Sequence, residues 1–338
     1  MPDLLLEVSD LEISFHSYAG DVRAVRGASF DLRRGETLAV VGESGSGKSV
    51  MARSLVGLLP SNANVEAGSA MLDGTDLLRL GDRELDQVRG SRIAMVFQDP
   101  MTSLDPTMKL GRQLTEGLRK RLGFSSGEAR QRAVELLTMV HLPDPEERLR
   151  QYPHQLSGGM RQRVVIAIAL ACEPQILLAD EPTTALDVTI QAQIMELLGE
   201  LQERLDMSIV LITHDLGVVA GIADRVAVMY AGRIVEIGQA REVFYQPRMP
   251  YTWGLLTSVP RPTLDSGQAL ATIPGSPPDP LDPPTGCPYT TRCPYAMGIC
   301  GHQMPEMTRF SAEHIAACWL HHPMSPDVDL PTIDGRPL

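Results

Sequence analysis

The chain has 338 residues, 43% of them hydrophobic, which is enough for one large domain with an appendage or for two modest domains. Its formal net charge of −12 argues against bulk electrostatic binding of nucleic acid, and its aromatic content of 4% argues against a base-stacking platform. No apolar run approaches the ~18 residues of a membrane helix, and the N-terminal residues lack a signal-peptide pattern. We therefore expect a cytosolic protein that reaches a membrane only through partners.

A short apolar strand is predicted at residues 37–41, followed by a glycine-rich loop and a helix over residues 48–59. The loop fits the pattern G-x-x-x-x-G-K-[ST] and predicts binding of a nucleotide such as ATP. Its glycines let backbone N–H groups converge on phosphates, and the helix N-terminus adds about half a positive charge. Lys48 is expected to reach the β and γ phosphates, and Ser49 to bind Mg²⁺. The predicted nucleotide-binding residues here are Gly42, Glu43, Ser44, Gly45, Ser46, Gly47, Lys48, Ser49 and Val50.

The next strand is predicted at residues 92–97 and ends at Gln98. Residues 108 to 150 are polar and helix-forming, which predicts an inserted helical subdomain. A second glycine turn then opens an amphipathic helix over residues 158–171; the turn comprises Leu156, Ser157, Gly158, Gly159 and Met160. A helix N-terminus is a second anion site, although Ser157 is equally suited to be an ordinary N-cap. Because the first loop already serves one phosphate group, the second site implies a dimer.

Three further strands, at residues 176–179, 209–213 and 226–229, are apolar on both faces, as in buried parallel sheets, and a closing strand is predicted at residues 232–237. Asp180, at the end of the first of these, suits the Mg²⁺ shell. Glu181 follows and can orient or deprotonate an attacking water. His214 follows the second strand; its alternative role is that of a hydrogen-bonded core histidine.

In order and spacing, these motifs resemble those of an ATP-binding cassette (ABC) ATPase subunit over residues 4 to 240. The resemblance implies that Gln98 senses Mg²⁺ and the γ-phosphate, that Ser157, Gly158 and Gly159 contact ATP on the opposite subunit, and that Asp187 crosses between subunits. His214 would then contact the γ-phosphate. Phe15 stands where the family places an aromatic that stacks on adenine, but Tyr18 or a core role for Phe15 remain alternatives. The predicted catalytic residues are Glu181, His214 and Gln98; Ser49, Gln98 and Asp180 are the predicted Mg²⁺ ligands.

The predicted fold is α/β: a phosphate-loop NTPase (RecA-like) core with a mostly parallel sheet, an inserted helical subdomain, an antiparallel β edge and a C-terminal cysteine-rich extension. Residues 1–245 would form the nucleotide-binding domain, with its helical subdomain at about 99–160, and residues 246–338 the extension. A narrower resemblance is to the dipeptide and oligopeptide importer ATPases. It is carried by residues 42–45, 97–104, 152–156 and 182–189, together with Pro250-Tyr251-Thr252 and the cysteine tail.

That branch implies a second, different ATPase subunit, two transmembrane permease subunits and a substrate-binding protein, with the ATPase on the cytoplasmic face of the inner membrane. Nickel importers are near relatives, so a nickel or other small-solute importer is an alternative. A soluble ABC ATPase acting on DNA or the ribosome is less favoured, because one cassette is present and the chain is acidic.

The tail is rich in proline, particularly over residues 274–294, and we expect little regular structure in it. Cys287, Cys293, Cys300 and Cys318 lie there. From the residues alone a structural cluster, zinc or free thiols remain open, since zinc sites usually have closer cysteine pairs and disulfides are disfavoured in a reducing cytosol. The resemblance implies a [4Fe–4S] cluster. His302 and His314 are expected to be solvated rather than ligands.

Overall fold

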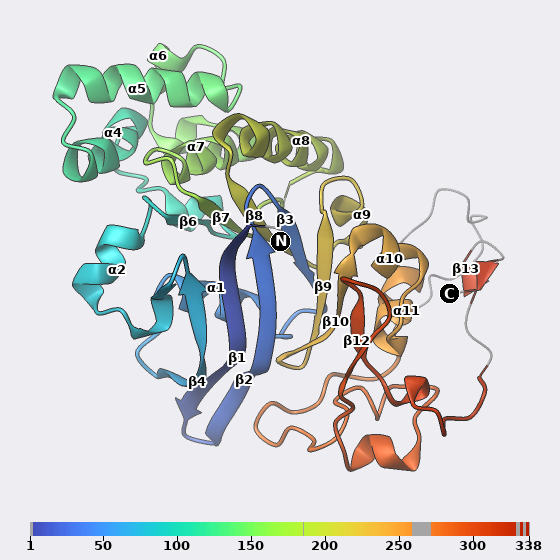
Figure 1. The fold of residues 1–338 in the computed structure, drawn as a ribbon. Coiled ribbons are helices and arrows are strands. Elements are labelled where there is room, and N and C mark those ends of the chain that lie inside the picture. Colours follow the sequence, from blue (N-terminus) through green and yellow to red (C-terminus); the bar gives the residue numbers. More distant parts are fainter. Residues whose placement is uncertain (1–2, 185, 259–271, 329–331, 334–335, 338) are drawn as a thin grey trace. The chain divides into compact units, whose positions relative to one another are not determined.

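The computed structural model describes residues 3–184, 186–258, 272–328, 332–333 and 336–337. It consists of two compact units. Figure 1 shows their helices and strands, coloured along the sequence. The first contains Asp3, Arg33–Thr37 and Arg79–Ile212, and the second contains Leu4–Leu32, Leu38–Leu78 and Thr213–Leu338. Both units are built from segments that are discontinuous in the sequence.

The sheet strands of the first unit are parallel and lie in the order β8-β7-β6. They are β6 (Ile93–Val96), β7 (Ile176–Asp180) and β8 (Ser208–Thr213). Every residue of β7 and β8 is buried. Apolar side chains on both faces are what a covered parallel strand requires, so the prediction of buried parallel strands is confirmed here.

Helices make up the rest of this unit: α2 (Asp82–Val88), α3 (Pro100–Ser103), α4 (Leu110–Arg121), α5 (Ser126–Met139), α6 (Pro145–Arg148), η2 (Pro153–Gln155), α7 (Gly158–Ala169) and α8 (Val188–Leu205). Figure 1 shows α4, α5, α6 and α7 as one group. On α4, Leu110, Leu114 and Leu118 recur every fourth residue and are buried, so one face of the helix packs inward. Helices therefore occupy the stretch whose composition predicted them.

Besides the short pair β13 (Thr332–Ile333) and β14 (Arg336–Pro337), the second unit contains two larger groups of strands. One has the order β2-β1-β4-β5 and comprises β2 (Gly20–Arg33), β1 (Leu4–Ser17), β4 (Ala63–Leu72) and β5 (Thr75–Asp76). The other has the order β11-β12-β10-β9-β3 and comprises β11 (Met307–Arg309), β12 (Ile315–Ala317), β10 (Arg233–Gln239), β9 (Arg225–Tyr230) and β3 (Thr37–Val41). Strand β3 pairs with β9 in parallel, whereas β9 and β10 are antiparallel. The sheets are therefore mixed.

The remaining elements of this unit are α1 (Lys48–Leu55), η1 (Leu77–Arg79), α9 (Leu216–Val219), α10 (Ala240–Tyr245), α11 (Pro250–Thr257), η3 (Gly298–Gly301), η4 (Trp319–His321), β13 (Thr332–Ile333) and β14 (Arg336–Pro337). Helix α1 ends earlier than predicted, because Gly57 adopts φ +60° directly after it. Tyr230, Tyr251 and Tyr289 are buried in one core cluster with side chains of β3, β9 and β10. The core thus joins residues from both ends of the sequence.

Outside the proline-rich residues 274–294 the tail forms several short helices and strands, so the expectation of little regular structure is wrong there. Strand β12 pairs antiparallel with β10, with Ala316 opposite Glu236, and β11 pairs with β12. His314, expected to be solvated, is buried: its Nε2 lies 2.7 Å from Oε1 of the fully buried Glu236. A buried acceptor makes the inward position of the imidazole favourable.

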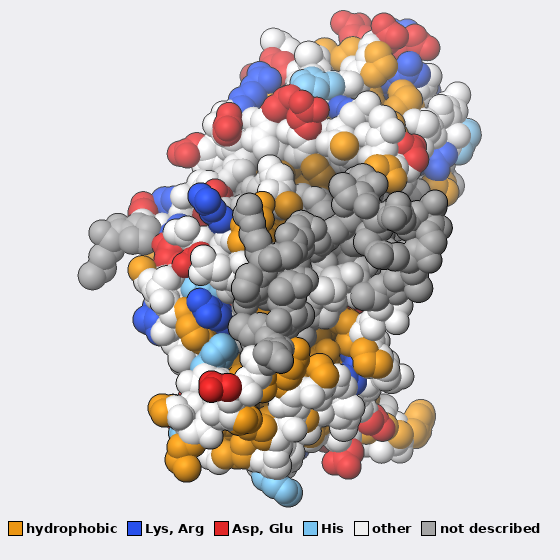
Figure 2. Space-filling model, turned by 90° about the vertical axis from the view of Figure 1, so that its right-hand side faces the viewer, with side chains coloured by type: hydrophobic (Ala, Val, Ile, Leu, Met, Phe, Trp, Pro, Cys, Tyr) orange, Lys and Arg blue, Asp and Glu red, His pale blue; other side chains and the backbone are white. Residues whose placement is uncertain are grey.

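The tail also contributes apolar surface. Figure 2 shows one face of the molecule, and hydrophobic side chains gather over the lower part of that face. Large exposed hydrophobic residues of the tail are Leu281, Ile299, Met307 and Met324. Among the residues that the structure describes, no helix combines the length and the hydropathy required to span a bilayer.

Candidate functional site

The phosphate loop joins β3 to α1 within the second unit, as predicted. Gly47 caps the helix in the left-handed region, at φ +104°, and a Cβ atom there would come within 2.5 Å of the Ala24 carbonyl oxygen. Gly42 is equally constrained, since its Cβ would meet the Met229 carbonyl oxygen at 2.1 Å. Both positions therefore require glycine, and the loop can turn tightly enough for its backbone amides to face an anion.

Lys48 is buried, and its ammonium lies inside the loop. Nζ donates to the carbonyl oxygens of Gly42 at 2.7 Å and Glu43 at 2.9 Å, and to Oγ of Ser46 at 3.2 Å. These bonds hold the ammonium charge of Lys48 beside the N-terminus of α1, where the helix dipole adds positive potential. Ser49 and Val50 are half-buried in the first turn of α1. These contacts suit an anion site, and nucleotide binding by these particular residues stays a prediction.

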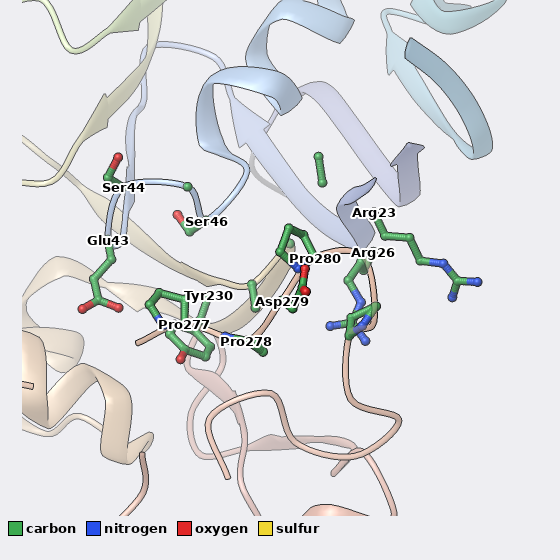
Figure 3. A pocket seen from close by; sticks show the side chains of 15 residues that line it. Arg23, Arg26, Glu43, Ser44, Ser46, Tyr230, Pro277, Pro278, Asp279 and Pro280 are labelled. Atoms are coloured by element: carbon green, nitrogen blue, oxygen red, sulfur yellow. The ribbon is translucent and has the colours of Figure 1, made fainter. Parts of the chain in front are cut away.

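A cavity of about 300 Å³ lies beside the loop. Figure 3 shows Glu43, Ser44 and Ser46 on the loop, with Pro277, Pro278 and Pro280 of the tail across from them. The remaining lining residues include Arg23, Arg26, Tyr230 and Asp279. The involvement of this proline segment was not anticipated, because nothing in its local sequence indicates a partner more than 200 residues away.

Arg26 gives the cavity a positive wall. Its side chain is buried, with Nη2 donating to the Pro284 carbonyl oxygen at 2.8 Å and Nη1 without a hydrogen-bond partner among the described residues. Burial, together with the neighbouring charges of Arg233 and Arg23, lowers the pKa of Arg26 to about 10. At neutral pH the guanidinium stays charged, so this wall favours an anionic neighbour.

The predicted carboxylates lie in the first unit, at the C-terminal end of β7. Asp180 is fully buried and is the last residue of the strand. Glu181 follows at φ +46°, an uncommon conformation for a residue with a Cβ. Gln98, which is 83 positions away, donates from Nε2 to Oε2 of Glu181 at 2.8 Å, and Thr184 Oγ1 donates to the same oxygen at 2.8 Å. The structure therefore brings Gln98 and Glu181 together and orients the carboxylate.

The second glycine turn forms the start of α7 in the first unit. Ser157 is the N-cap and accepts from the Met160 N–H at 3.4 Å, so the ordinary capping role is confirmed. Ser157 and Gly158 are exposed, and Leu156 is buried. A Cβ atom on Gly159 would come within 2.7 Å of the Ile190 side chain of α8. Glycine thus allows α7 and α8 to approach closely while leaving the turn accessible.

Asp187 similarly caps α8, where its carboxylate accepts from the Ile190 N–H at 3.0 Å. His214 is exposed directly after β8. Phe15 is half-buried on β1, and Tyr18 is fully exposed in the following turn. Neither aromatic lines the cavity beside the phosphate loop. Adenine stacking on Phe15 therefore stays a prediction, as do the proposed roles of Asp187 and His214.

The iron–sulfur prediction is wrong. Within the described ranges, no group of three or more His, Cys, Asp or Glu side chains is placed so that it could hold a metal ion. Cys287, Cys293, Cys300 and Cys318 are free cysteines that line one pocket of only about 10 Å³, which is room for about one water. Burial raises the pKa of Cys293 to about 11 and of Cys318 to about 12. Since a metal binds the thiolate, the raised pKa values make Cys293 and Cys318 poor ligands.

Comparisons with known proteins agree with this combination of loop, turn and carboxylates. Residues 25–184 match the model of the ABC transporter family, and residues 235–300 match the C-terminal region of oligopeptide/dipeptide transporters. One solved structure, the dimeric post-hydrolysis state of the ATP-binding cassette MJ0796 bound to ADP and Pi, is 31% identical. It superimposes with a TM-score of 0.63 over 70% of this chain and 99% of that one. The fold and site thus define an ABC ATPase cassette.

Two similar proteins of known function indicate the branch of the ABC family to which the chain is related. The oligopeptide transport ATP-binding protein OppD of Bacillus subtilis is 56% identical over 97% of this chain and 92% of its own length. The dipeptide transport ATP-binding protein DppD of the same organism is 56% identical over 94% of each chain. The chain belongs to the family of ATP-binding proteins of oligopeptide and dipeptide ABC transporters.

Proposed function

We propose that this protein is the ATP-hydrolysing subunit that drives import of dipeptides or oligopeptides across the cytoplasmic membrane. The observation that carries the proposal is the 56% identity with peptide-transport ATPases over nearly the whole chain, including the C-terminal region. The same ATPase mechanism would also serve a nickel or other small-solute importer, so the cargo is the part of the proposal that transport assays decide.

The phosphate loop supplies the nucleotide site. Backbone amides of residues 42–49 and the N-terminus of α1 would receive the β and γ phosphates, with the buried Lys48 neutralising their charge. The Lys48 ammonium donates to two carbonyl oxygens and one hydroxyl of the loop, so the lysine is already held where the phosphates would arrive. This preorganisation lowers the entropy lost on binding.

Glu181 would act on the attacking water. Its Oε2 accepts hydrogen bonds from Gln98 and Thr184, and these bonds would orient the carboxylate as a general base toward water. His214 would contact the γ-phosphate and stabilise charge that develops on it. Phosphoryl transfer needs positioning and electrostatic stabilisation more than covalent chemistry, and a fixed carboxylate provides the first of these.

Magnesium fits the donors that the chain offers. The hydroxyl of Ser49, the amide oxygen of Gln98 and the carboxylate of Asp180 are hard oxygen ligands of the kind that Mg²⁺ prefers. With its Nε2 on Glu181, Gln98 has its amide oxygen directed away from that carboxylate. The ion, when bound with ATP, would supply charge neutralisation at the phosphates.

Subunit pairing would complete the site. The turn Leu156, Ser157, Gly158, Gly159 and Met160 would cap ATP held by a second ATPase subunit, and Asp187 would cross between the two. The exposure of Ser157, Gly158 and Asp187 supports this role. We propose a heterodimer of two related ATPases, bound to two permease subunits on the cytoplasmic face of the inner membrane and supplied by a substrate-binding protein.

The domain assignment follows the same family pattern. Residues 1–245 would be the nucleotide-binding domain, with a helical subdomain at about 99–160, and residues 246–338 a C-terminal extension of the importer branch. The match of residues 235–300 to the C-terminal region of these transporters supports the extension.

Replacing Glu181 by Gln tests the mechanism. Nucleotide affinity should be unchanged, whereas turnover should fall about 10²-fold or more, since an amide cannot accept the proton of water. The matched control is Glu196→Gln, an exposed residue of α8, which should hydrolyse ATP normally. Undiminished hydrolysis by the Glu181 variant would refute the assigned role. Peptide uptake by vesicles that contain the complete transporter would then test the cargo.

A further inference from the structure

Arg292 of the C-terminal tail forms an ion pair with Glu43 of the phosphate loop. Arg292 donates to the Glu43 carboxylate with both terminal nitrogens, from Nη1 to Oε2 at 2.5 Å and from Nη2 to Oε1 at 2.9 Å. The arginine side chain is only 3% exposed and the glutamate 28%. A bidentate, largely buried pair of this kind fixes geometry as well as charge. Arg292 and Glu43 are 249 positions apart and both belong to the second unit.

Arg292 is also hydrogen-bonded to the backbone of the tail itself. Its Nε donates to the Pro274 carbonyl oxygen at 2.8 Å, and Nη2 donates to that of Ile273 at 3.3 Å. Nη1 also reaches Oη of Tyr230 at 3.2 Å, and the guanidinium lies 5.8 Å from the ring centroid of Tyr230. The guanidinium therefore cannot follow Glu43 if the loop moves; instead it fixes the position of Glu43.

The backbone of Glu43 is fixed as well. Its N–H donates to Oη of the fully buried Tyr251 at 2.8 Å, and its carbonyl oxygen accepts from Nζ of Lys48 at 2.9 Å. Glu43 thus links residues of the C-terminal region to the lysine that faces the phosphates. A change in the position of Arg292 would be transmitted to Lys48 through one residue.

Charge gives Arg292 a second effect. Glu43 places a carboxylate in a loop built to receive a polyanion, where an uncompensated negative charge would repel the nucleotide. Arg292 pairs with that charge, and the Glu43 carboxylate is the main cause that raises the pKa of the guanidinium above its usual value. Without the arginine, a half-buried carboxylate would stand unpaired beside the phosphates.

We propose that Arg292 is a positioning residue of the nucleotide site: through Glu43 it sets the phosphate loop and cancels a negative charge beside it, so that the C-terminal tail forms part of the ATP site. This inference rests on the proposed function, because it assumes that the loop binds ATP. It extends that function by assigning the tail an effect on nucleotide affinity.

The test compares the full-length chain with the variants Arg292→Met, Glu43→Gln and the double variant. Affinity is measured by titration with a fluorescent ATP analogue, and ATP KM and kcat by phosphate release. Arg292→Met should raise the nucleotide Kd about tenfold, because the unpaired carboxylate repels the phosphates. KM should rise in parallel, with a smaller effect on kcat. The double variant should bind at least about threefold more tightly than Arg292→Met, since it removes the repelling charge.

The control is a second arginine–carboxylate pair in the same unit, neither member of which belongs to the loop. Nη2 of Arg225 lies 3.0 Å from Oδ1 of Asp31, and Nη1 lies 3.1 Å from Oδ2. Arg225→Met should lower the melting temperature without changing nucleotide Kd. A merely structural role for Arg292 would give the same pattern as this control.

Two results would overturn the inference: parental nucleotide affinity in the Arg292→Met variant, or a double variant that binds as weakly as Arg292→Met. If Arg292→Met does not fold, Arg292→Lys keeps the charge but loses the bidentate geometry, and it should show an intermediate Kd. If the parent chain itself binds no nucleotide, the proposed function fails first, so the two failures are distinguishable.

Discussion

The buried carboxylate of Glu236 offers a measurable test of how the tail is attached. Glu236 lies on β10 and is fully buried. Its Oε1 accepts from the Arg248 N–H at 2.6 Å, and its Oε2 accepts from the Met249 N–H at 3.1 Å and from Thr252 Oγ1 at 2.6 Å. His314, which precedes β12, places Nε2 2.7 Å from Oε1. One side chain therefore connects β10 to the first turn of α11 and to the tail.

Replacing Glu236 by Ala would leave these four donors without their acceptor. Each buried donor left without its acceptor costs about 1–3 kcal/mol, and the cavity left by the truncation adds to that cost. We therefore expect the free energy of unfolding to fall by about 4 kcal/mol. The magnitude exceeds that of an ordinary hydrogen bond, about 1 kcal/mol, because all four donors are affected together.

Urea unfolding followed by tryptophan fluorescence is the appropriate assay. Trp253 lies on α11 and Trp319 lies just after β12, so both fluorophores report on the region that Glu236 joins. Glu306→Gln, an exposed acid of the tail, is the control and should stay within about 0.5 kcal/mol of the parent. A loss below about 1 kcal/mol for Glu236→Ala would refute the idea that the carboxylate holds these elements together.

Three further experiments, one by chemical labelling and two by substitution, test other parts of the chain. Because burial raises the pKa of Cys318 to about 12, iodoacetamide should label it at pH 8 roughly 10²-fold more slowly in the native protein than in urea, and labelling should speed up as pH rises; equal rates would contradict the burial. Gly47→Ala should abolish nucleotide binding, measured by titration, because the new Cβ meets the Ala24 carbonyl oxygen; retained affinity would show that the loop can relax. Leu114→Ala should cost about 2–5 kcal/mol in urea unfolding, since this side chain of α4 is 1% exposed, whereas a small loss would indicate collapse around the site.

The elements predicted best from the sequence are those specified by local patterns. Residues 209–213 were predicted as a strand and form most of β8, because an apolar run with no polar face can only be buried. The phosphate loop was placed correctly between β3 and α1, since its glycines and lysine are adjacent in the sequence. The same holds for Ser157, whose capping bond spans three residues.

The contacts that could not be predicted join residues that are far apart in the sequence. The bonds of Arg292 to Glu43 and of His314 to Glu236 join positions 249 and 78 apart, and no periodicity marks such pairs. The cysteines show the opposite error. Four soft ligands near each other in sequence suggested a cluster, but among the described residues they form no group that could hold a metal, and burial raises the pKa of Cys293. Their spacing alone could not show how deeply they are buried.

Strand β12 also determines which strand forms the exposed edge of the sheet. Without β12, β10 would be left as an open edge of seven residues, with free N–H and C=O groups able to pair with another chain. Among the residues that the structure describes, the two added strands move the edge to β11, which is three residues long and ends at Arg309. So short and charged an edge is a weak template, and the tail thereby protects the sheet against aggregation by strand addition.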